Sequence, residues 1–335
     1  MPADRSVPAD RSAPADRSAP PAPTPRPAPR RSAPPPPPPR DVRFGGGRPS
    51  LLGRLGGLVD EWIARRVDPD DRLKQIQTPT NEFGFDSFGF NRDFVRRALL
   101  PARWIYRHYF RVQCFGTEKV PPVGRVFLIA NHSGQLPLDA AMILLSMLFD
   151  KQPPRMVRTM VERWVAQIPF FSYLFARWGQ IVGIPDNCRE VLENEEAILV
   201  FPEGVRGISK TFDRAYELQE FGLGFMRLAL ELGVPIVPVA VVGAEEQAPA
   251  LANLTRVGDI IGAPAFPVTP TFPLLGPLGL LPYPVKYRIY YGEPMRFDGD
   301  PNDEDDTLQE KVDAVKAEIQ ALLQRGLAER EHIFW

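Results

Sequence analysis

The stretch ANHSGQLPLD at residues 130–139 constrains this chain more than any other. It joins a short run of β-branched and aromatic residues at 126–130 to an apolar run at 140–149. The first run predicts a buried strand and the second a helix, with the polar stretch as the turn between them. Because α/β proteins usually carry their chemistry at the ends of strands, we expect a functional site at this turn.

Two side chains of the turn form a candidate pair. His132, one of only three histidines, stands at the end of the predicted strand, and Asp139 opens the predicted helix. A neutral imidazole is a suitable general base near pH 7, and a carboxylate on its second ring nitrogen would orient it. The alternative is structural, with Asp139 as the N-cap of the helix and Gly134 and Pro137 only shaping a turn.

A second motif, FPEGVRG at 201–207, follows another short apolar run at 197–201. Gly204 and Gly207 permit tight turns and a close approach of the backbone to a ligand. Glu203 adds a carboxylate, and the guanidinium of Arg206 offers several donors to a phosphate. Two strand ends with polar residues and glycine predict one shared site, for which the supporting residues are Asn131, Ser133, Gly134 and Gly207.

Composition narrows the function classes. The formal net charge of −1 over 335 residues gives no reason to expect a nucleic-acid partner. Two cysteines exclude a disulfide scaffold and fit a reducing compartment, and three scattered histidines argue against a zinc site or any other metal site. No apolar run is long enough to span a bilayer, and no secretory h-region is present. We therefore expect a cytosolic chain, which could still lie on the cytoplasmic side of a membrane as a peripheral or monotopic protein.

The chain divides into three predicted regions. Residues 1–50 contain PADRS three times and six consecutive prolines, a composition typical of a disordered tail. Residues 51–110 are expected to be helical, with an amphipathic helix at 51–66, and residues 111–335 to form the main domain. The positive charge of the tail would favour anionic lipid, although a solvated tail is the simpler interpretation.

Two segments suggest contact with a membrane surface. Residues 93–110 interleave arginines with Trp104 and other aromatic residues, as interfacial helices do, and Pro101 is expected to kink or split this helix. Residues 263–284 form a proline- and leucine-rich apolar stretch, expected to be a loop that enters lipid or caps a hydrophobic tunnel. The alternative for 93–110 is a core helix with a solvated basic face. Residues 164–179 are expected to line an acyl-chain groove or to belong to the core.

The rest of the chain alternates strands with helices. The pattern predicts an α/β fold, a mixed and mainly parallel sheet flanked by helices. The proline-containing strand at 234–242 is expected at an edge or a bulge, and a C-terminal helix is expected at 307–325, capped by Asp305 or Asp306. The other expected strands are 111–115, 180–183, 285–291 and 155–162, the last alternatively a short helix, and the other helices are 188–194 and 215–232.

The motifs NHSGQLPLD, FPEGVRG and VPIVPV, in that order, resemble the sequence blocks of the phospholipid/glycerol acyltransferases, which include the 1-acylglycerol-3-phosphate acyltransferases. The resemblance covers about residues 93–295. It implies an acyltransferase-like fold with His132 as general base and Asp139 orienting it, and acceptor binding by Glu203, Gly204 and Arg206. It also implies that an acyl group passes from acyl-CoA or acyl-carrier protein, a substrate rather than a cofactor, to a glycerolipid such as a lysophospholipid, at a membrane.

The chain departs from that family in two places. The usual spacing is HxxxxD, whereas six residues separate His132 from Asp139, so the turn has to absorb two extra residues. The middle block, GQIVGIPDNCR, has no arginine before Arg189, which favours a neutral acceptor such as a mono- or diacylglycerol. A catalytically inactive lipid-binding protein and a thioester or ester hydrolase are the remaining alternatives. The sequence gives no indication of the oligomeric state.

Overall fold

The computed structural model describes residues 69–76, 78–134, 136–164, 170–254 and 266–334. The predicted tail at 1–50 and the predicted helix at 51–66 lie outside the described residues, as do residues 165–169 and 255–265 of the two apolar segments. The proposed boundaries at residues 50 and 110 stay predictions.

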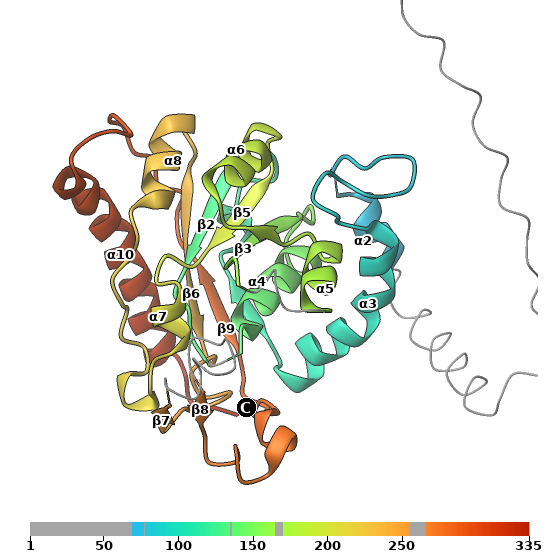
Figure 1. Ribbon diagram of the computed structural model, residues 1–335, viewed down its shortest axis with the longest axis vertical. Helices are drawn as coiled ribbons and strands as arrows, with labels where there is room; N and C mark the ends of the chain where they lie inside the picture. Colours follow the sequence, from blue (N-terminus) through green and yellow to red (C-terminus); the bar gives the residue numbers. More distant parts are fainter. Residues whose placement is uncertain (1–68, 77, 135, 165–169, 255–265, 335) are drawn as a thin grey trace, which may run out of the picture. The chain divides into compact units, whose positions relative to one another are not determined.

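A seven-stranded sheet forms the centre of the described part (Figure 1). Neighbouring strands are parallel except for β6 and β9, which run antiparallel, so the predicted mixed and mainly parallel sheet is confirmed. The strands, in spatial order, are β1 (Gln113–Phe115), β9 (Arg288–Tyr291), β6 (Ile236–Val242), β2 (Val126–Ala130), β5 (Ala197–Val200), β3 (Val157–Val161) and β4 (Ile181–Val182).

Helices cover both faces of this sheet (Figure 1). The longer helices are α3 (Arg92–Trp104), α4 (Leu138–Phe149), α5 (Phe171–Arg177), α6 (Pro185–Glu193), α8 (Gly224–Leu232) and α10 (Asp305–Ala328). Shorter elements are α2 (Pro69–Lys74), η1 (Ile105–Tyr109), η2 (Thr117–Lys119), α7 (Val205–Ile208), η4 (Phe212–Arg214), η5 (Gly276–Leu280) and the two-stranded sheet of β7 (Ala252–Asn253) and β8 (Pro267–Val268).

Strand β2 shows why helices are needed on both faces. All five of its residues are buried, and successive side chains of a strand point to opposite faces. Leu128 therefore joins the core cluster that contains residues of α3 and α4, and Phe127 and Ile129 join the cluster that contains residues of α6, α8 and α10. A strand that is apolar at every position fits only a sheet covered on both sides.

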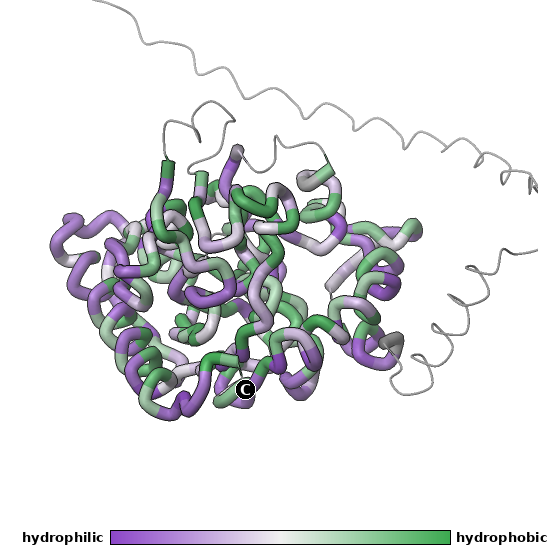
Figure 2. Tube along the Cα trace, turned by 90° about the horizontal axis from the view of Figure 1, so that it is seen from below, coloured by the Kyte–Doolittle hydropathy of each residue, from purple (hydrophilic) through white to green (hydrophobic). Residues whose placement is uncertain are grey.

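The C-terminal helix confirms its predicted apolar stripe. Glu304 is its N-cap, so Asp305 and Asp306 lie in the first turn, and the expectation that one of them caps the helix is wrong. The stripe faces the sheet, and hydrophilic stretches follow the outer helices in Figure 2. The buried residues of the stripe are Leu308, Val312, Val315, Ile319 and Leu322.

The proline-containing strand is central rather than at an edge. β6 pairs with β2 on one side and β9 on the other. Pro238 lies beyond the end of β9, where Gly292 donates its N–H to the Pro238 carbonyl. The next bridge joins Ile236 to Met295. From Pro238 to Ile236 the chain moves two residues along β6, whereas from Gly292 to Met295 it moves three residues along the segment after β9. This bulge lies where the missing N–H of Pro238 would otherwise be needed.

The predicted helix at 215–232 begins only at Gly224. The backbone N–H groups of Tyr216 and Gln219 donate to the buried carboxylates of Glu245 and Glu203. Tyr216 also has a φ of 64°, in the left-handed region that helices do not use. The segment before α8 therefore serves buried carboxylates instead of continuing a helix.

The predicted interfacial helix at 93–110 has a buried side and an exposed side, and its contact with a membrane stays a prediction. Pro101 lies inside α3, and the chain continues as the π-helix η1, so the proline does not split the helix. Tyr106 and Phe110 are buried in the core, whereas Trp104 and Ile105 are exposed. One face of the segment therefore packs on the protein and the other faces outward.

Candidate active site

The two predicted motifs meet at the carboxyl edge of the sheet, where β2, β5 and β6 end side by side. Asn131, the first residue after β2, is buried and fixes this edge. Its amide oxygen accepts from the Val241 N–H at 2.8 Å, and its amide nitrogen donates to the Val241 carbonyl at 3.2 Å. Asn131 thereby ties the end of β2 to β6.

His132 and Asp139 are in direct contact. The distance from His132 Nδ1 to Asp139 Oδ2 is 2.7 Å, and the side chains are 12% and 0% exposed. With the carboxylate at Nδ1, the imidazole carries its proton there and directs the lone pair of Nε2 away from Asp139. The six intervening residues therefore do not prevent the pairing.

Asp139 is held for this role by the start of α4. Its carboxylate also accepts from the Ser133 N–H at 3.0 Å and the Ala140 N–H at 2.8 Å. The N-cap of α4 is Pro137, so the alternative in which Asp139 caps the helix is wrong. A carboxylate in the first turn of a helix also benefits from the helix dipole.

The turn between the two residues requires glycine at position 134. Gly134 has a φ of 74°, and a Cβ there would lie 2.5 Å from Gln247 Nε2 and 2.7 Å from the Ala244 carbonyl oxygen. Gln247 Nε2 donates to the Leu136 carbonyl at 2.9 Å. The longer turn is thus accommodated by close packing against the segment that follows β6.

Glu203 lies against the backbone of His132. It is buried, and its Oε1 and Oε2 accept from the His132 and Gln219 N–H groups, each at 2.8 Å. Both oxygens are thus engaged with backbone. This arrangement favours a role in positioning His132, whereas acceptor binding by Glu203 itself stays a prediction.

Among the other residues of the second motif, Gly207 and Phe201 contact His132, whereas Arg206 is exposed. A Cβ at Gly207 would lie 2.8 Å from His132 Cβ, so glycine is needed for this close approach, while Gly204 turns the chain with a φ of 55°. The Phe201 ring stacks on the imidazole with 4.0 Å between centroids. Arg206 is exposed and pairs with Glu220 at 2.8 Å.

Ser133 is completely buried beside this pair. Its hydroxyl oxygen has no hydrogen-bond partner among the described residues, and its N–H donates to Asp139. Because Ser133 is inaccessible, its side chain is poorly placed to attack a substrate. It supports the turn through its backbone.

Sequence reasoning missed three buried residues near the motifs: Lys210, Glu245 and Gln247. Lys210 donates to Glu245 Oε1 at 2.8 Å, and Gln247 braces the turn. Burial raises the pKa of the Glu245 carboxyl, Lys210 lowers it, and the carboxylate of Glu203 raises it further. The run EEQ at 245–247, polar residues directly after a buried strand, was the available signal.

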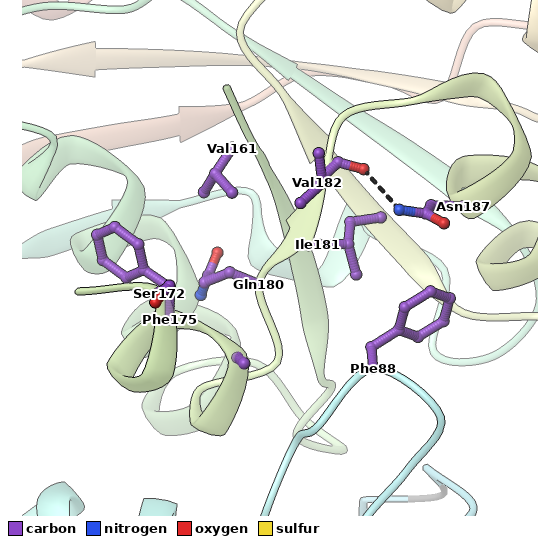
Figure 3. A pocket seen from close by; sticks show the side chains of 9 residues that line it. Phe88, Val161, Ser172, Phe175, Gln180, Ile181, Val182 and Asn187 are labelled. Atoms are coloured by element: carbon purple, nitrogen blue, oxygen red, sulfur yellow. Dashed lines mark hydrogen bonds between the residues drawn. The ribbon is translucent and has the colours of Figure 1, made fainter. Parts of the chain in front are cut away.

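A cavity of about 230 Å³ opens further along the same edge, where β3 and β4 end (Figure 3). Its lining is mainly apolar, and Asn187 is held by the Val182 carbonyl. Ser172 and Phe175 line it, whereas Trp178 packs against the core, so the predicted segment 164–179 contributes to both. The described lining residues are Phe88, Val161, Ser172, Phe175, Ala176, Gln180, Ile181, Val182 and Asn187.

The described residues include neither a metal-binding cluster nor a membrane-spanning helix. Among them, no group of three or more His, Cys, Asp or Glu side chains is placed to hold a metal ion. No helix in this part of the chain is both long and apolar enough to cross a membrane.

Comparisons with known proteins show which family the chain resembles. The acyltransferase family model matches residues 111–242. An uncharacterised protein of Mycobacterium leprae is 37% identical over 264 residues, 77% of this chain and 72% of that protein. An uncharacterised protein of Mycobacterium tuberculosis is 36% identical, covering 86% and 78%. The chain belongs to the phospholipid/glycerol acyltransferase superfamily, as its motifs indicated.

Two more distant similarities are to named enzymes. The DGAT1/2-independent enzyme synthesizing storage lipids of Bos taurus is 26% identical, over 63% of this chain and 58% of that protein. The solved 1-acyl-sn-glycerophosphate acyltransferase of Thermotoga maritima is 17% identical with a TM-score of 0.44, covering 83% of this chain and 90% of that one.

The packing of Gly207 against His132 yields a prediction. Gly207→Ala places a methyl group 2.8 Å from His132 Cβ and 3.0 Å from Glu203 Cβ, so His132 has to move. We expect acyl-transfer kcat to fall about 10- to 100-fold, because small displacements of a reacting group have effects of that size. Gly224→Ala is the control, since nothing lies within 4 Å of its added Cβ. Unchanged kcat in a folded Gly207→Ala protein would contradict the proposed packing.

Proposed function

We propose that this acyltransferase moves a fatty acyl group from a thioester donor to the hydroxyl of a glycerolipid, with His132 as general base. The contact between His132 Nδ1 and the buried carboxylate of Asp139 carries this proposal. It also favours an active enzyme over a purely lipid-binding protein, because the longer turn leaves the pair in hydrogen-bonding contact. Acyl-CoA and acyl-carrier protein both present the required thioester, and the reaction needs no cofactor.

The proposed reaction is a direct transfer. His132 Nε2 takes the proton of the acceptor hydroxyl as its oxygen attacks the thioester carbonyl. Asp139 stabilises the imidazolium that forms. The tetrahedral intermediate then expels the thiolate, which takes the proton from His132, and the ester is released. No acyl-enzyme is required, in keeping with the buried side chain of Ser133.

A neutral acceptor is the second candidate, and the pairing of Arg206 favours it. A phosphate approaching this guanidinium would meet the Glu220 carboxylate already 2.8 Å from it, so like charges would be brought together. An uncharged mono- or diacylglycerol meets no such repulsion. The bovine relative, whose name refers to storage lipids, supports the same class of acceptor.

We also propose that the enzyme works on the surface of a membrane, on its cytoplasmic side. Leu274 and Leu278 are 85% and 70% exposed, and Trp104 is also exposed. We call residues 271–284 the leucine-rich loop. The Tyr109 hydroxyl donates to the Pro282 carbonyl at 2.5 Å, which joins the end of this loop to η1. Exposed leucines beside an aromatic, arginine-containing helix suit the interface of a bilayer. Free Cys114 and Cys188 fit the reducing side.

The reaction is tested with labelled palmitoyl-CoA, or palmitoyl-acyl-carrier protein, and a panel of lysophosphatidate, lysophosphatidylcholine, monoacylglycerol and diacylglycerol. We expect His132→Ala and Asp139→Asn to lower kcat/KM by about 10²- to 10⁴-fold, the usual contribution of a general base and its orienting carboxylate. His332→Ala, at an exposed histidine near the carboxyl end of the chain, is the control. Fatty-acid release that needs no acceptor would instead indicate a hydrolase, and full activity of His132→Ala would refute the assignment.

Acceptor choice is tested by Glu220→Gln. Removing the carboxylate frees Arg206 for a phosphate, so we expect the kcat/KM ratio of lysophosphatidate to monoacylglycerol to rise about three- to tenfold, consistent with an exposed ion pair. Glu231→Gln, in the exposed pair with Arg189, is the matched control. An unchanged ratio would show that Glu220 does not discriminate between acceptors.

Membrane contact is tested by flotation with vesicles of phosphatidylethanolamine and phosphatidylglycerol. The double substitution of Leu274 and Leu278 by Asp should lower the partition coefficient at least tenfold, since each buried leucine contributes about 1.5–3 kcal/mol. Val123→Asp, at an exposed valine just before the amino end of β2, is the control. Equal flotation of the two proteins would exclude the leucine-rich loop as the contact.

A further inference from the structure

Two buried carboxylates share one buried ammonium group next to His132. The Lys210 Nζ lies 2.8 Å from Glu245 Oε1 and 4.0 Å from Glu203 Oε2, and all three side chains are at most 5% exposed. Lys210 follows α7, Glu203 follows β5 and Glu245 follows β6. The ammonium group thus lies between segments that leave two central strands, and it reaches His132 through Glu203.

The charges of this cluster depend on one another. Buried ions are costly unless they are paired and hydrogen-bonded, and two carboxylates without a cation between them repel each other. Without Lys210, Glu203 and Glu245 would face each other as like charges in a region that excludes water. One of them would have to take up a proton or move.

Glu203 cannot change without affecting His132. Its Oε1 is the acceptor for the His132 N–H, and an ionised acceptor makes the stronger hydrogen bond. Protonation or rotation of Glu203 would weaken this bond and release the backbone that carries the imidazole. The contact with Asp139 at 2.7 Å depends on that backbone position.

Lys210 also holds the segment before α8. Its Nζ donates to the Glu217 carbonyl at 3.1 Å, and the Gln219 N–H donates to Glu203. The next residue is Glu220, the partner of Arg206. The same ammonium group therefore braces the segment that approaches Arg206.

We propose that Lys210 is a positioning residue for acyl transfer: its charge compensates Glu203 and Glu245 and so fixes the backbone of His132 and the segment 216–220. The proposal rests on the proposed role of His132, to which Lys210 is linked through Glu203. Its effect should fall on kcat more than on KM, because it places the base rather than the substrates.

The test compares Lys210→Met with the double variant Lys210→Met/Glu245→Gln. Lys210→Met should lower kcat at least about tenfold with KM changed less than about threefold, the pattern of a displaced catalytic group. Hydrogen exchange at the His132 amide, followed by mass spectrometry on peptides spanning 130–134, should become faster. The double variant removes one repelling carboxylate, so exchange should slow again and part of kcat should return. Lys119→Met, in the exposed pair with Glu293, is the control.

Hydrogen exchange separates this inference from the proposed function. If neither the wild-type protein nor any variant transfers acyl groups, the proposed function fails. Hydrogen exchange of the backbone at 130–134 then decides the role of Lys210 by itself. A folded Lys210→Met protein with wild-type kcat and wild-type hydrogen exchange overturns the inference. The same holds if the only change in that protein is a lower thermal stability. If Lys210→Met does not fold, the double variant decides: a folded double variant with a protected His132 amide supports compensation of charge, and one with an unprotected amide refutes it.

Discussion

The site depends on buried carboxylates that accept hydrogen bonds from backbone N–H groups. Asp139 accepts from Ser133 and Ala140, and Glu203 accepts from His132 and Gln219. Such charge-assisted bonds are stronger than neutral ones, and a water-poor surrounding strengthens them further. They hold the irregular backbone at the end of the sheet in place. The imidazole is therefore positioned from both sides before any substrate arrives.

The same requirement explains the irregular chain before α8. A buried carboxylate needs donors, and a regular helix over 215–232 would use the N–H group of Gln219 internally. Tyr216 adds a second connection, because its hydroxyl donates to Glu246 at 2.5 Å and accepts from the Gly243 N–H. Burial raises the pKa of this hydroxyl, and the Glu246 carboxylate raises it further, so it stays a donor. Arg330, just after α10, contacts the same hydroxyl, which ties the C-terminal region to the site.

The sheet and the His132–Asp139 pair could be predicted from the sequence because both follow from patterns of neighbouring residues. Apolar runs of five to nine residues ending in polar turns identified β2, β5 and β6. Long-range contacts left little local signal. The segment at 215–223 has helical composition, but its N–H groups are used by carboxylates distant in sequence. Pro238 suggested an edge, and only the end of β9 explains why a central strand tolerates it. Nothing in the local sequence around Lys210 indicates that its side chain is buried.

Gln247 connects the proposed membrane contact with the turn that carries His132. Its side chain donates to the Leu136 carbonyl, and its own carbonyl accepts from the Tyr283 N–H at 2.7 Å, at the end of the leucine-rich loop. The Tyr287 hydroxyl fixes the amide oxygen at 2.5 Å. Drawing an acyl chain fully into water costs about 0.8 kcal/mol for each CH₂ group. In the proposed arrangement, a lipid-facing loop braced against this turn would avoid most of that cost, because the acceptor hydroxyl would reach His132 while the acyl chains stayed in apolar surroundings.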